Sequence, residues 1–325
     1  MSDVGKAAVY LENSILKELL MQPDITDISF NGAAIFYQSS LYGRKKADLV
    51  LSYEQAYQLI KHLANLMNRP FTYLDAIVDM SIARYRIFAV GPSVSRKEYE
   101  PTLTFAIRIH PVEHQVIMKF LTNDGPWIQL FQFFIHHGVS IVIAGKTGSG
   151  KTQLQKELLM LMQEAKRVII LDNILELDGL HIPHLDISIW QIQSNFSIQK
   201  MVEGALRSHP DWLLIAESRG AEFKEVLRSV KTGHPIITTL HSDRLDHVYD
   251  RMVSMLLIEE SFTHVEQLFR DVKRAFPVLI QLVTLETNTG LLRRIDQVSI
   301  MVQGQLQIFK STVTKERILE VMNTW

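Results

Sequence analysis

The sequence predicts an α/β protein of two domains: a small α+β domain at the N-terminal end and a larger domain built on a mainly parallel sheet. Its first third mixes amphipathic helical patterns with alternating strand patterns. The remainder alternates short, continuously apolar strands with helices, as a parallel sheet covered on both faces does. Between them, residues 113–127 contain Asn-Asp-Gly and a proline, which are typical of a linker. We therefore expect domains over residues 1–112 and 128–325.

The small domain is expected to contain two helices and an antiparallel sheet. Apolar residues near helical spacing predict a helix over 9–20, and "SYEQAYQLIKHLANLMN" predicts a second helix that Ser52 caps. Alternation on both sides of Asn31-Gly32 indicates a hairpin. "SIARYRIFAV" and "TLTFAIRIH" read as further strands, separated by the turn-rich "GPSVSRKEYEP".

The larger domain is expected to hold its parallel strands in four apolar runs. These are "VSIVIAG", "RVIILD", "WLLIAE" and "PIITTLH". Their Val, Ile and Leu content and the helical segments between them favour parallel pairing. From about residue 253 onward we expect further helices, followed by strands with an antiparallel pattern.

Charge and composition exclude several classes of protein. The 325 residues carry 34 Lys plus Arg and 35 Asp plus Glu, and this balance is even along the chain, with 12 basic and 11 acidic residues through Val112. Without a basic domain or tail, stable nucleic-acid binding is not expected. Cysteine is absent, which excludes disulfides and cysteine-ligated zinc and favours the cytoplasm. No run approaches the roughly 18 apolar residues of a membrane span, so we expect at most peripheral membrane association.

"GKTGSGKT" satisfies the phosphate-binding pattern G-x-x-x-x-G-K-S/T, and it lies between a predicted strand and a predicted helix, as this pattern requires. The residues are Gly145, Lys146, Thr147, Gly148, Ser149, Gly150, Lys151 and Thr152. Glycines let backbone N–H groups face phosphates, Lys151 can reach the β and γ phosphates, and Thr152 offers a hydroxyl to Mg²⁺. The sequence therefore predicts ATP and Mg²⁺ as ligands.

Acidic residues follow two predicted parallel strands at their carboxyl ends, where open α/β sheets bind ligands. Asp172 ends one strand, with Glu176 just beyond it, and Glu217 ends another, with Arg219 two residues on. An isolated carboxylate at a strand end is usually a solvated cap. Two such ends beside a phosphate loop favour the interpretation that they bind the metal and orient water.

The stretch "TGHPIITTLHSD" places His234 and His241 at opposite ends of a predicted strand, about 20 Å apart at ~3.3 Å per residue. That separation argues against a shared metal ion. His241 would lie on the ligand side of the sheet, where we expect a γ-phosphate sensor or a hydrogen-bond relay rather than a packing residue. His234, between a glycine and a proline, fits a role in shaping the turn equally well.

In their order, these motifs resemble those of the secretion ATPases of type II and type IV systems. "GKTGSGKT" matches the Walker A motif, and "LDNILEL" is similar to the acidic Asp box, usually written I-E-D-x-x-E. "ALRSHPDWLLIAESRGAE" resembles the Walker B segment and "TGHPIITTLHSD" the His box. "ITDISFNG" and "ARYRIFAVGPSVS…TLTFAIRIH" look like parts of the N-terminal domain. The resemblance covers nearly the whole chain.

The resemblance implies a RecA-like motor domain, a homo-hexameric ring and ATP hydrolysis coupled to domain movement. It assigns Glu217 as the Walker B glutamate and a candidate Mg²⁺ contact, Arg219 as the neighbouring arginine and Glu176 as the second acid of the Asp box. Arg84 or Arg86, together with Arg108, corresponds to N-terminal-domain arginines that can meet nucleotide phosphates. Inner-membrane secretion-channel or pilus-assembly proteins are the implied partners, at the cytoplasmic face of the inner membrane.

Two departures from the family pattern leave alternatives open. Asp172 and Asn173 replace the Glu-Asp pair of the Asp box, which puts in doubt which acid positions water. The cysteine cluster of many pilus-assembly members is absent, which favours the conjugation-type branch. A pilus-retraction motor, a nucleotide-switched scaffold with little hydrolysis and a DNA helicase are the alternatives, and the even charge distribution disfavours the helicase.

Overall fold

The computed structural model divides into two compact units. Its described residues are 2–110, 116, 118–121, 125–173, 175–192, 198–220, 222–258, 264–288 and 290–325. Unit 1 comprises Met1–Val112 and Glu286–Leu291, and unit 2 comprises Glu113–Leu285 and Leu292–Trp325. Of the linker predicted over 113–127, residues 113–115, 117 and 122–124 lie outside the described residues.

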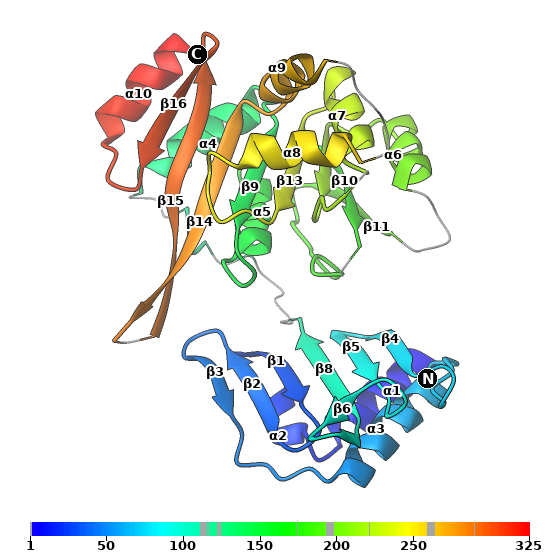
Figure 1. The fold of residues 1–325 in the computed structure, drawn as a ribbon. Coiled ribbons are helices and arrows are strands. Elements are labelled where there is room, and N and C mark those ends of the chain that lie inside the picture. Colours follow the sequence, from blue (N-terminus) through cyan, green and yellow to red (C-terminus); the bar gives the residue numbers. More distant parts are fainter. Residues whose placement is uncertain are drawn as a thin grey trace. The chain divides into compact units, whose positions relative to one another are not determined.

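Unit 1 is an antiparallel sheet with helices packed on one face (Figure 1). Within the described residues the strand order is β3-β2-β1-β8-β5-β4. The strands are β1 (Ile25–Phe30), β2 (Ile35–Ser39), β3 (Gly43–Lys46), β4 (Ile77–Ile82), β5 (Tyr85–Val90) and β8 (Thr104–Ile109), with the short pair β6 (Arg96–Lys97) and β7 (Glu100–Pro101). The helices are α1 (Asp3–Glu12), α2 (Lys17–Leu20) and α3 (Tyr53–Leu66). The hairpin predicted around Asn31-Gly32 is confirmed as β1–β2.

The helix predicted with Ser52 as its cap is confirmed as α3. The Ser52 hydroxyl accepts a hydrogen bond from Gln55 N at 3.2 Å, and Gln55 Oε1 accepts one from Ser52 N at 3.1 Å. This reciprocal pair satisfies two of the N–H groups that a helix start leaves without intrahelical partners. Residues such as Leu59 and Leu63 then turn toward the core of unit 1.

The helix predicted over 9–20 is wrong in its extent. Helix α1 begins after its cap Ser2 and ends at Glu12, and α2 is a separate single turn. Between them, Asn13 donates a side-chain hydrogen bond to Val9 O, and the Ser14 hydroxyl accepts from Leu16 N, so side chains compete with the helical backbone bonds. The apolar spacing continues through this break because Leu16 and the leucines of α2 are buried in the same core.

The segment read as one strand, "SIARYRIFAV", is divided between two strands. A turn at Ala83, whose φ is +47°, separates the end of β4 from β5, and these strands pair with Ile82 opposite Tyr85. The alternation of apolar residues persists across the turn, so periodicity alone does not reveal it.

Unit 2 is a mixed sheet whose described strands follow the order β11-β10-β12-β13-β9-β14-β15-β16. They are β9 (Ile141–Gly145), β10 (Arg167–Asp172), β11 (Asp186–Gln191), β12 (Trp212–Ile215), β13 (Ile236–Leu240), β14 (Val278–Thr287), β15 (Gly290–Val302) and β16 (Gln305–Lys310). The pairs from β11 to β9 and the pair of β9 with β14 are parallel, and β15 pairs with β16 antiparallel. The four predicted parallel strands are confirmed, and β11 is a strand that the sequence analysis does not identify.

Helices cover both faces of this sheet (Figure 1). They are α4 (Trp127–His136), α5 (Lys151–Met160), α6 (Ile198–Arg207), α7 (Phe223–Lys231), α8 (Val248–Leu256), α9 (Val265–Ala275) and α10 (Lys315–Thr324). Along β9, Ile141 and Ile143 pack in a core with α4, α5 and α10, whereas Val142 and Ala144 pack in a second core with α6 to α9. This double burial explains the continuous apolar runs. In the described part of the chain, no helix has the length and apolar character to span a bilayer.

Candidate functional site

The phosphate loop lies between β9 and α5, as predicted. Gly148 and Gly150 have φ of +76° and +94°, a backbone region that residues with a Cβ rarely adopt. Gly145 is required for a different reason: a Cβ there would lie 2.5 Å from Ser149 Oγ and 2.9 Å from Leu282 O. The loop therefore turns tightly from the strand into the N-terminus of α5, where backbone N–H groups and the helix dipole favour an anion.

Lys151, the first residue of α5, extends back across the loop. Its Nζ donates to Gly145 O at 3.0 Å and to Lys146 O at 3.1 Å, and it lies 3.4 Å from His241 Nδ1. The residue is only 9% exposed. The strand end thus holds the ammonium in place, and one positive charge sits inside the loop that the sequence assigns to phosphates.

Glu217, beyond the end of β12, is the centre of a charged cluster. It is 5% exposed, Arg219 Nη2 donates to its Oε2 at 2.6 Å, and His241 Nε2 lies 2.9 Å from its Oε1. Burial acts to raise the pKa of Glu217, but the hydrogen bond and charge of Arg219, the charge that His241 gains at acidic pH and the charge of Lys151 together hold that pKa below its ordinary value. The carboxylate is therefore ionised at neutral pH.

His241 directly follows β13 and lies between this carboxylate and Lys151. Burial, and then the positive charge of Lys151, lower the pKa of His241, although the charge of Glu217 opposes the shift. The imidazole is therefore neutral at pH 7. Lys151 has only donors, so Nδ1 of the neutral ring is the acceptor and Nε2 carries the proton. Nε2 lies close to Glu217 Oε1, but its N–H is not directed at that oxygen well enough to form a hydrogen bond. His241 thus links the loop lysine to the buried carboxylate, whereas His234 precedes β13 at its other end.

Glu176 reaches the phosphate loop from the β10 side. Its Oε2 accepts a hydrogen bond from the Thr152 hydroxyl. Mg²⁺ prefers oxygen ligands and retains several waters, binding through one or two protein groups together with phosphates. The hydroxyl of Thr152 and the carboxylate of Glu176 fit such a metal beside the loop. Within the described residues, no group of three or more His, Asp or Glu side chains could hold a metal by itself.

Asp172, the last residue of β10, is fully buried, and its carboxylate binds backbone. Oδ1 accepts from Leu175 N and Oδ2 from Leu177 N, both at 2.8 Å. Leu175 has φ of +57°, an unfavourable conformation for a leucine. Asp172 therefore holds the turn that carries Glu176, and the loop acid that contacts Thr152 is Glu176.

The three candidate arginines belong to unit 1. Arg86 Nη2 lies 3.0 Å from Asp79 Oδ2, and Arg108 Nε lies 3.2 Å from Asp27 Oδ1. Arg86 and Arg108 are direct neighbours on β5 and β8. Arg84 lies in the preceding turn and donates to Tyr85 Oη and Leu20 O.

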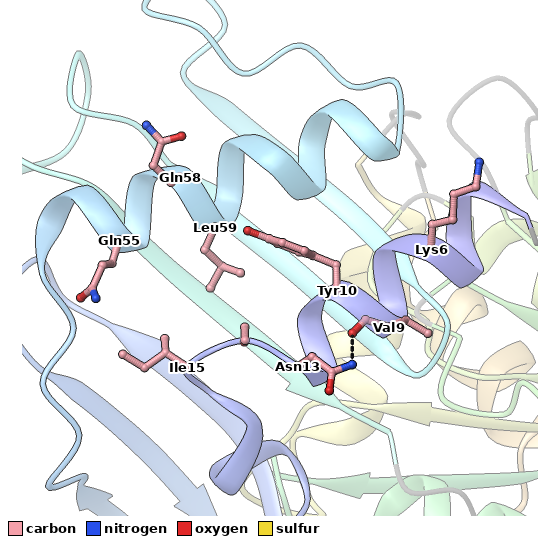
Figure 2. Close-up of a pocket in the computed structure, with 9 residues that line it drawn as sticks. Lys6, Val9, Tyr10, Asn13, Ile15, Gln55, Gln58 and Leu59 are labelled. Atoms are coloured by element: carbon pink, nitrogen blue, oxygen red, sulfur yellow. Dashed lines mark hydrogen bonds between the residues drawn. The ribbon is translucent and has the colours of Figure 1, made fainter.

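Hollows in the surface of the described residues include one beside the phosphate loop and one in unit 1. One, of about 760 Å³, adjoins the phosphate loop and is lined by Lys146, Thr147, His241, Ser242, Asp243, His247, Asp250, Arg251 and Ser254. The other, of about 690 Å³, lies between α1 and α3 of unit 1, where Tyr10 extends toward Leu59 (Figure 2). Apolar and amide side chains line most of this second hollow, and no carboxylate does. The first hollow is therefore the one that continues the charged site.

Buried amides near the site were missed by sequence reasoning. Gln281 on β14 donates through Nε2 to Ser242 O at 3.3 Å and so ties the loop after His241 to the sheet. Gln155 on α5 donates to Ile215 O at 3.2 Å, just before Glu217. Gln281 could have been singled out in the sequence, because it is a polar residue that interrupts the apolar run "VLIQLV". Gln155 could have been found only by noting that it lies one helical turn after Lys151.

Comparisons with known proteins place the chain in a family. The family model "Type II/IV secretion system protein" matches residues 115–308. An uncharacterized protein of Bacillus anthracis is 29% identical over 241 residues, covering 72% of this chain and 53% of its own length. The type IV secretion system protein VirB11 of Bartonella henselae is 29% identical over 188 residues, covering 55% and 51%. The chain thus spans about half the length of these curated relatives.

A solved structure extends the likeness in fold to nearly the whole chain. The ATPase DotB of Legionella pneumophila aligns with a TM-score of 0.65 and 20% sequence identity, covering 97% of this chain and 86% of DotB. At that identity the alignment shows a shared fold.

Proposed function

Because the chain belongs to the type II/IV secretion system protein family, we propose that it is an ATP-hydrolysing hexameric motor that powers type IV secretion, conjugative transfer or pilus assembly. The observation that carries the proposal is the convergence of Lys151, Glu217 and His241 at the phosphate loop, with Thr152 bound to Glu176. A loop that only bound phosphate would not need an ionised, nearly buried glutamate beside it.

Each residue has a distinct part in the proposed reaction. Lys151 is placed to neutralise charge on the β and γ phosphates as the terminal bond breaks. Glu217, kept ionised by Arg219, is placed to accept a hydrogen bond from the attacking water and orient it. His241 relays the presence of the γ phosphate between Lys151 and Glu217. Bound with ATP, Mg²⁺ supplies further positive charge at the phosphate oxygens, and Thr152 and Glu176 are the residues that would hold it.

The arginines of unit 1 are proposed as phosphate contacts. Asp79 and Asp27 now pair with Arg86 and Arg108, respectively. A phosphate must therefore compete with a carboxylate for each guanidinium, and the bidentate geometry of Arg suits that exchange. Arg84, whose contacts include a backbone carbonyl, would have to give up that bond.

The assembly and its location follow from the family and are likewise proposals. We expect a homo-hexamer at the cytoplasmic face of the inner membrane, bound to secretion-channel or pilus-assembly proteins. Stable nucleic-acid binding is not expected, because the 34 basic and 35 acidic residues leave no charge excess. A pilus-retraction motor is the alternative within the same fold.

One observation favours a second candidate function, a nucleotide-switched scaffold. Both carboxylate oxygens of Asp172 accept backbone hydrogen bonds, so this acid is committed to holding its turn. If Glu217 alone orients water, hydrolysis would be slow and nucleotide binding could act mainly as a switch.

The test is steady-state ATP hydrolysis by the purified full chain, compared with Lys151→Ala and with Lys315→Ala as the matched control. Lys315 is an exposed residue in the first turn of α10. We expect Lys151→Ala to abolish hydrolysis and weaken ATP binding while folding normally, and Lys315→Ala to match the wild type. An unimpaired rate in Lys151→Ala would refute the assigned site, and binding without turnover in the wild type would support the scaffold.

A further inference from the structure

A buried carboxylate on the phosphate-loop helix holds a segment from an earlier part of the chain. Glu157 lies on α5 and is fully buried. Its Oε1 accepts from Lys119 N at 2.8 Å, and its Oε2 accepts from Phe120 N at 2.9 Å and Leu121 N at 2.8 Å. Three successive backbone groups are thereby fastened to the helix that begins with Lys151.

The fastened segment places an aromatic ring on the phosphate loop. A Cβ added to Gly150 would lie 2.7 Å from Phe120 Cζ and 3.0 Å from Phe120 Cε2, so the ring edge rests directly on this glycine. Gly150 immediately precedes Lys151 and has φ of +94°. The Phe120 side chain therefore limits movement of the loop at the residue where it turns into the helix.

Arg293 of β15 contacts the same stretch of the loop. Its Nε donates to Gly148 O at 2.7 Å, and its Cδ would lie 3.7 Å from a Cβ on Gly150. Phe120 and Arg293 thus contact the loop at Gly150 and Gly148, the glycines on either side of Ser149. Glycine-rich backbone is the most mobile kind, so contacts at these positions restrict the loop most effectively.

We propose that Glu157 is a positioning residue for the nucleotide site. It fastens residues 119–121 to α5 and so keeps the Phe120 ring against Gly150. Together with Arg293, the ring then holds the phosphate loop in the conformation that binds the triphosphate. This inference rests on the proposed nucleotide binding. Neither Glu157 nor Phe120 touches reacting atoms, and the loop contacts phosphate in ground and transition states alike. Their loss therefore weakens binding and raises KM while leaving kcat nearly unchanged.

Glu157→Gln is the sharpest perturbation. The three backbone donors are shared between both carboxylate oxygens, and an amide offers only one oxygen, so at least one N–H group must face an NH₂ group. If the competent loop conformation falls to about a tenth of the population, the apparent Kd rises about tenfold. Glu266→Gln, an exposed glutamate in the first turn of α9, is the matched control.

The experiment measures Kd for ADP and for a non-hydrolysable ATP analogue by calorimetry, together with kcat, KM and amide hydrogen exchange. In Glu157→Gln we expect about a tenfold higher Kd and KM, a kcat within about twofold of wild type and faster exchange at residues 119–121. The control should match the wild type in all of these. Unchanged Kd, or a fall in kcat with unchanged Kd, would overturn the proposal.

A second variant covers the case in which Glu157→Gln fails to fold. Phe120→Ala leaves the three hydrogen bonds in place and removes only the ring, and Phe269→Ala removes a comparable, partly buried ring from the other core of unit 2. Phe120→Ala should raise Kd and Phe269→Ala should not; equal Kd values in the two would overturn the proposal. If the wild type binds nucleotide without hydrolysing it, the motor proposal fails, while the Kd comparison still decides this one.

Discussion

Replacing Glu217 by glutamine should stop hydrolysis while leaving ATP bound. The substitution keeps the size of a side chain that is 5% exposed and removes the charge that Arg219 and His241 contact at 2.6 Å and 2.9 Å. Lys151, which contacts phosphate in the proposed site, is bonded to Gly145 O and Lys146 O rather than to Glu217. Nucleotide binding should therefore survive.

The size of the effect follows from the hydrogen-bond pattern around this carboxylate. Arg219 donates to Oε2, and the protonated Nε2 of His241 lies 2.9 Å from Oε1, so a glutamine puts its NH₂ group against one of these two N–H groups. The water also loses its charged acceptor. Positioned acid–base groups contribute about 10²–10⁴-fold, so we expect the single-turnover rate of Glu217→Gln to fall at least 10²-fold. Arg219, without its partner, should become more mobile.

Comparing Asp172→Asn with Glu217→Gln distinguishes an acid that takes part in catalysis from one that only holds a turn in place. One of the two backbone N–H groups held by Asp172 would face an amide NH₂, which costs about 1–3 kcal/mol of folding stability. The turn carrying Glu176 should loosen, and we expect a rate reduced by less than about tenfold and a Tm lowered by a few degrees.

Both variants are to be assayed in single turnovers at saturating ATP and Mg²⁺, with Tm measured for each. The expected pattern is a stable, inactive Glu217→Gln that retains ATP and a less stable, active Asp172→Asn. If Asp172→Asn were the inactive enzyme and Glu217→Gln the active one, the catalytic assignment would be reversed. A Glu217→Gln protein that loses ATP binding would instead place this carboxylate in ground-state binding.

Further predictions concern assembly, pH and metal content. With a non-hydrolysable ATP analogue bound, analytical ultracentrifugation should detect a six-membered ring, and a strictly monomeric species would count heavily against the motor. Because the pKa of His241 is lowered from its usual value of about 6.5, kcat/KM should not change with the charge of this residue between pH 7 and 8, and it should fall only at lower pH, where a protonated ring lies beside Lys151. An acid limb centred above pH 7 that disappears in His241→Gln would contradict that. Elemental analysis should find no stoichiometric zinc, since the chain has no cysteine and β13 separates its two candidate histidines; one zinc per chain would show that the histidines were misread.

The parts of the fold that the sequence predicts are those with a local physical signal. The buried strands of unit 2 are recognisable because both of their faces are covered, so that β9, for example, is apolar at every position. β11 lacks this signal: its residues are only partly buried or exposed, and it begins at Asp186. The break after α1 escapes prediction because Leu11 and Leu16 enter one core from separate segments. Periodicity reports which residues are buried and not where the backbone turns.

In the candidate site, too, the sequence predicts which residues lie near the ligand but not which groups they contact. Lys151, Thr152 and Glu217 can be placed from sequence because a short motif or a strand end determines their surroundings. The environment of Glu157 depends on backbone donors some 36 residues earlier, and nothing in "KTQLQKELLM" indicates that a glutamate there is buried. Asp172 also looks catalytic in the sequence, because it ends a predicted strand beside the phosphate loop. Only the fold reveals that its two carboxylate oxygens accept hydrogen bonds from Leu175 N and Leu177 N. A carboxylate's residue type and its strand-end position therefore predict that it lies near the ligand, whereas its role is decided by which donors the folded backbone directs at it.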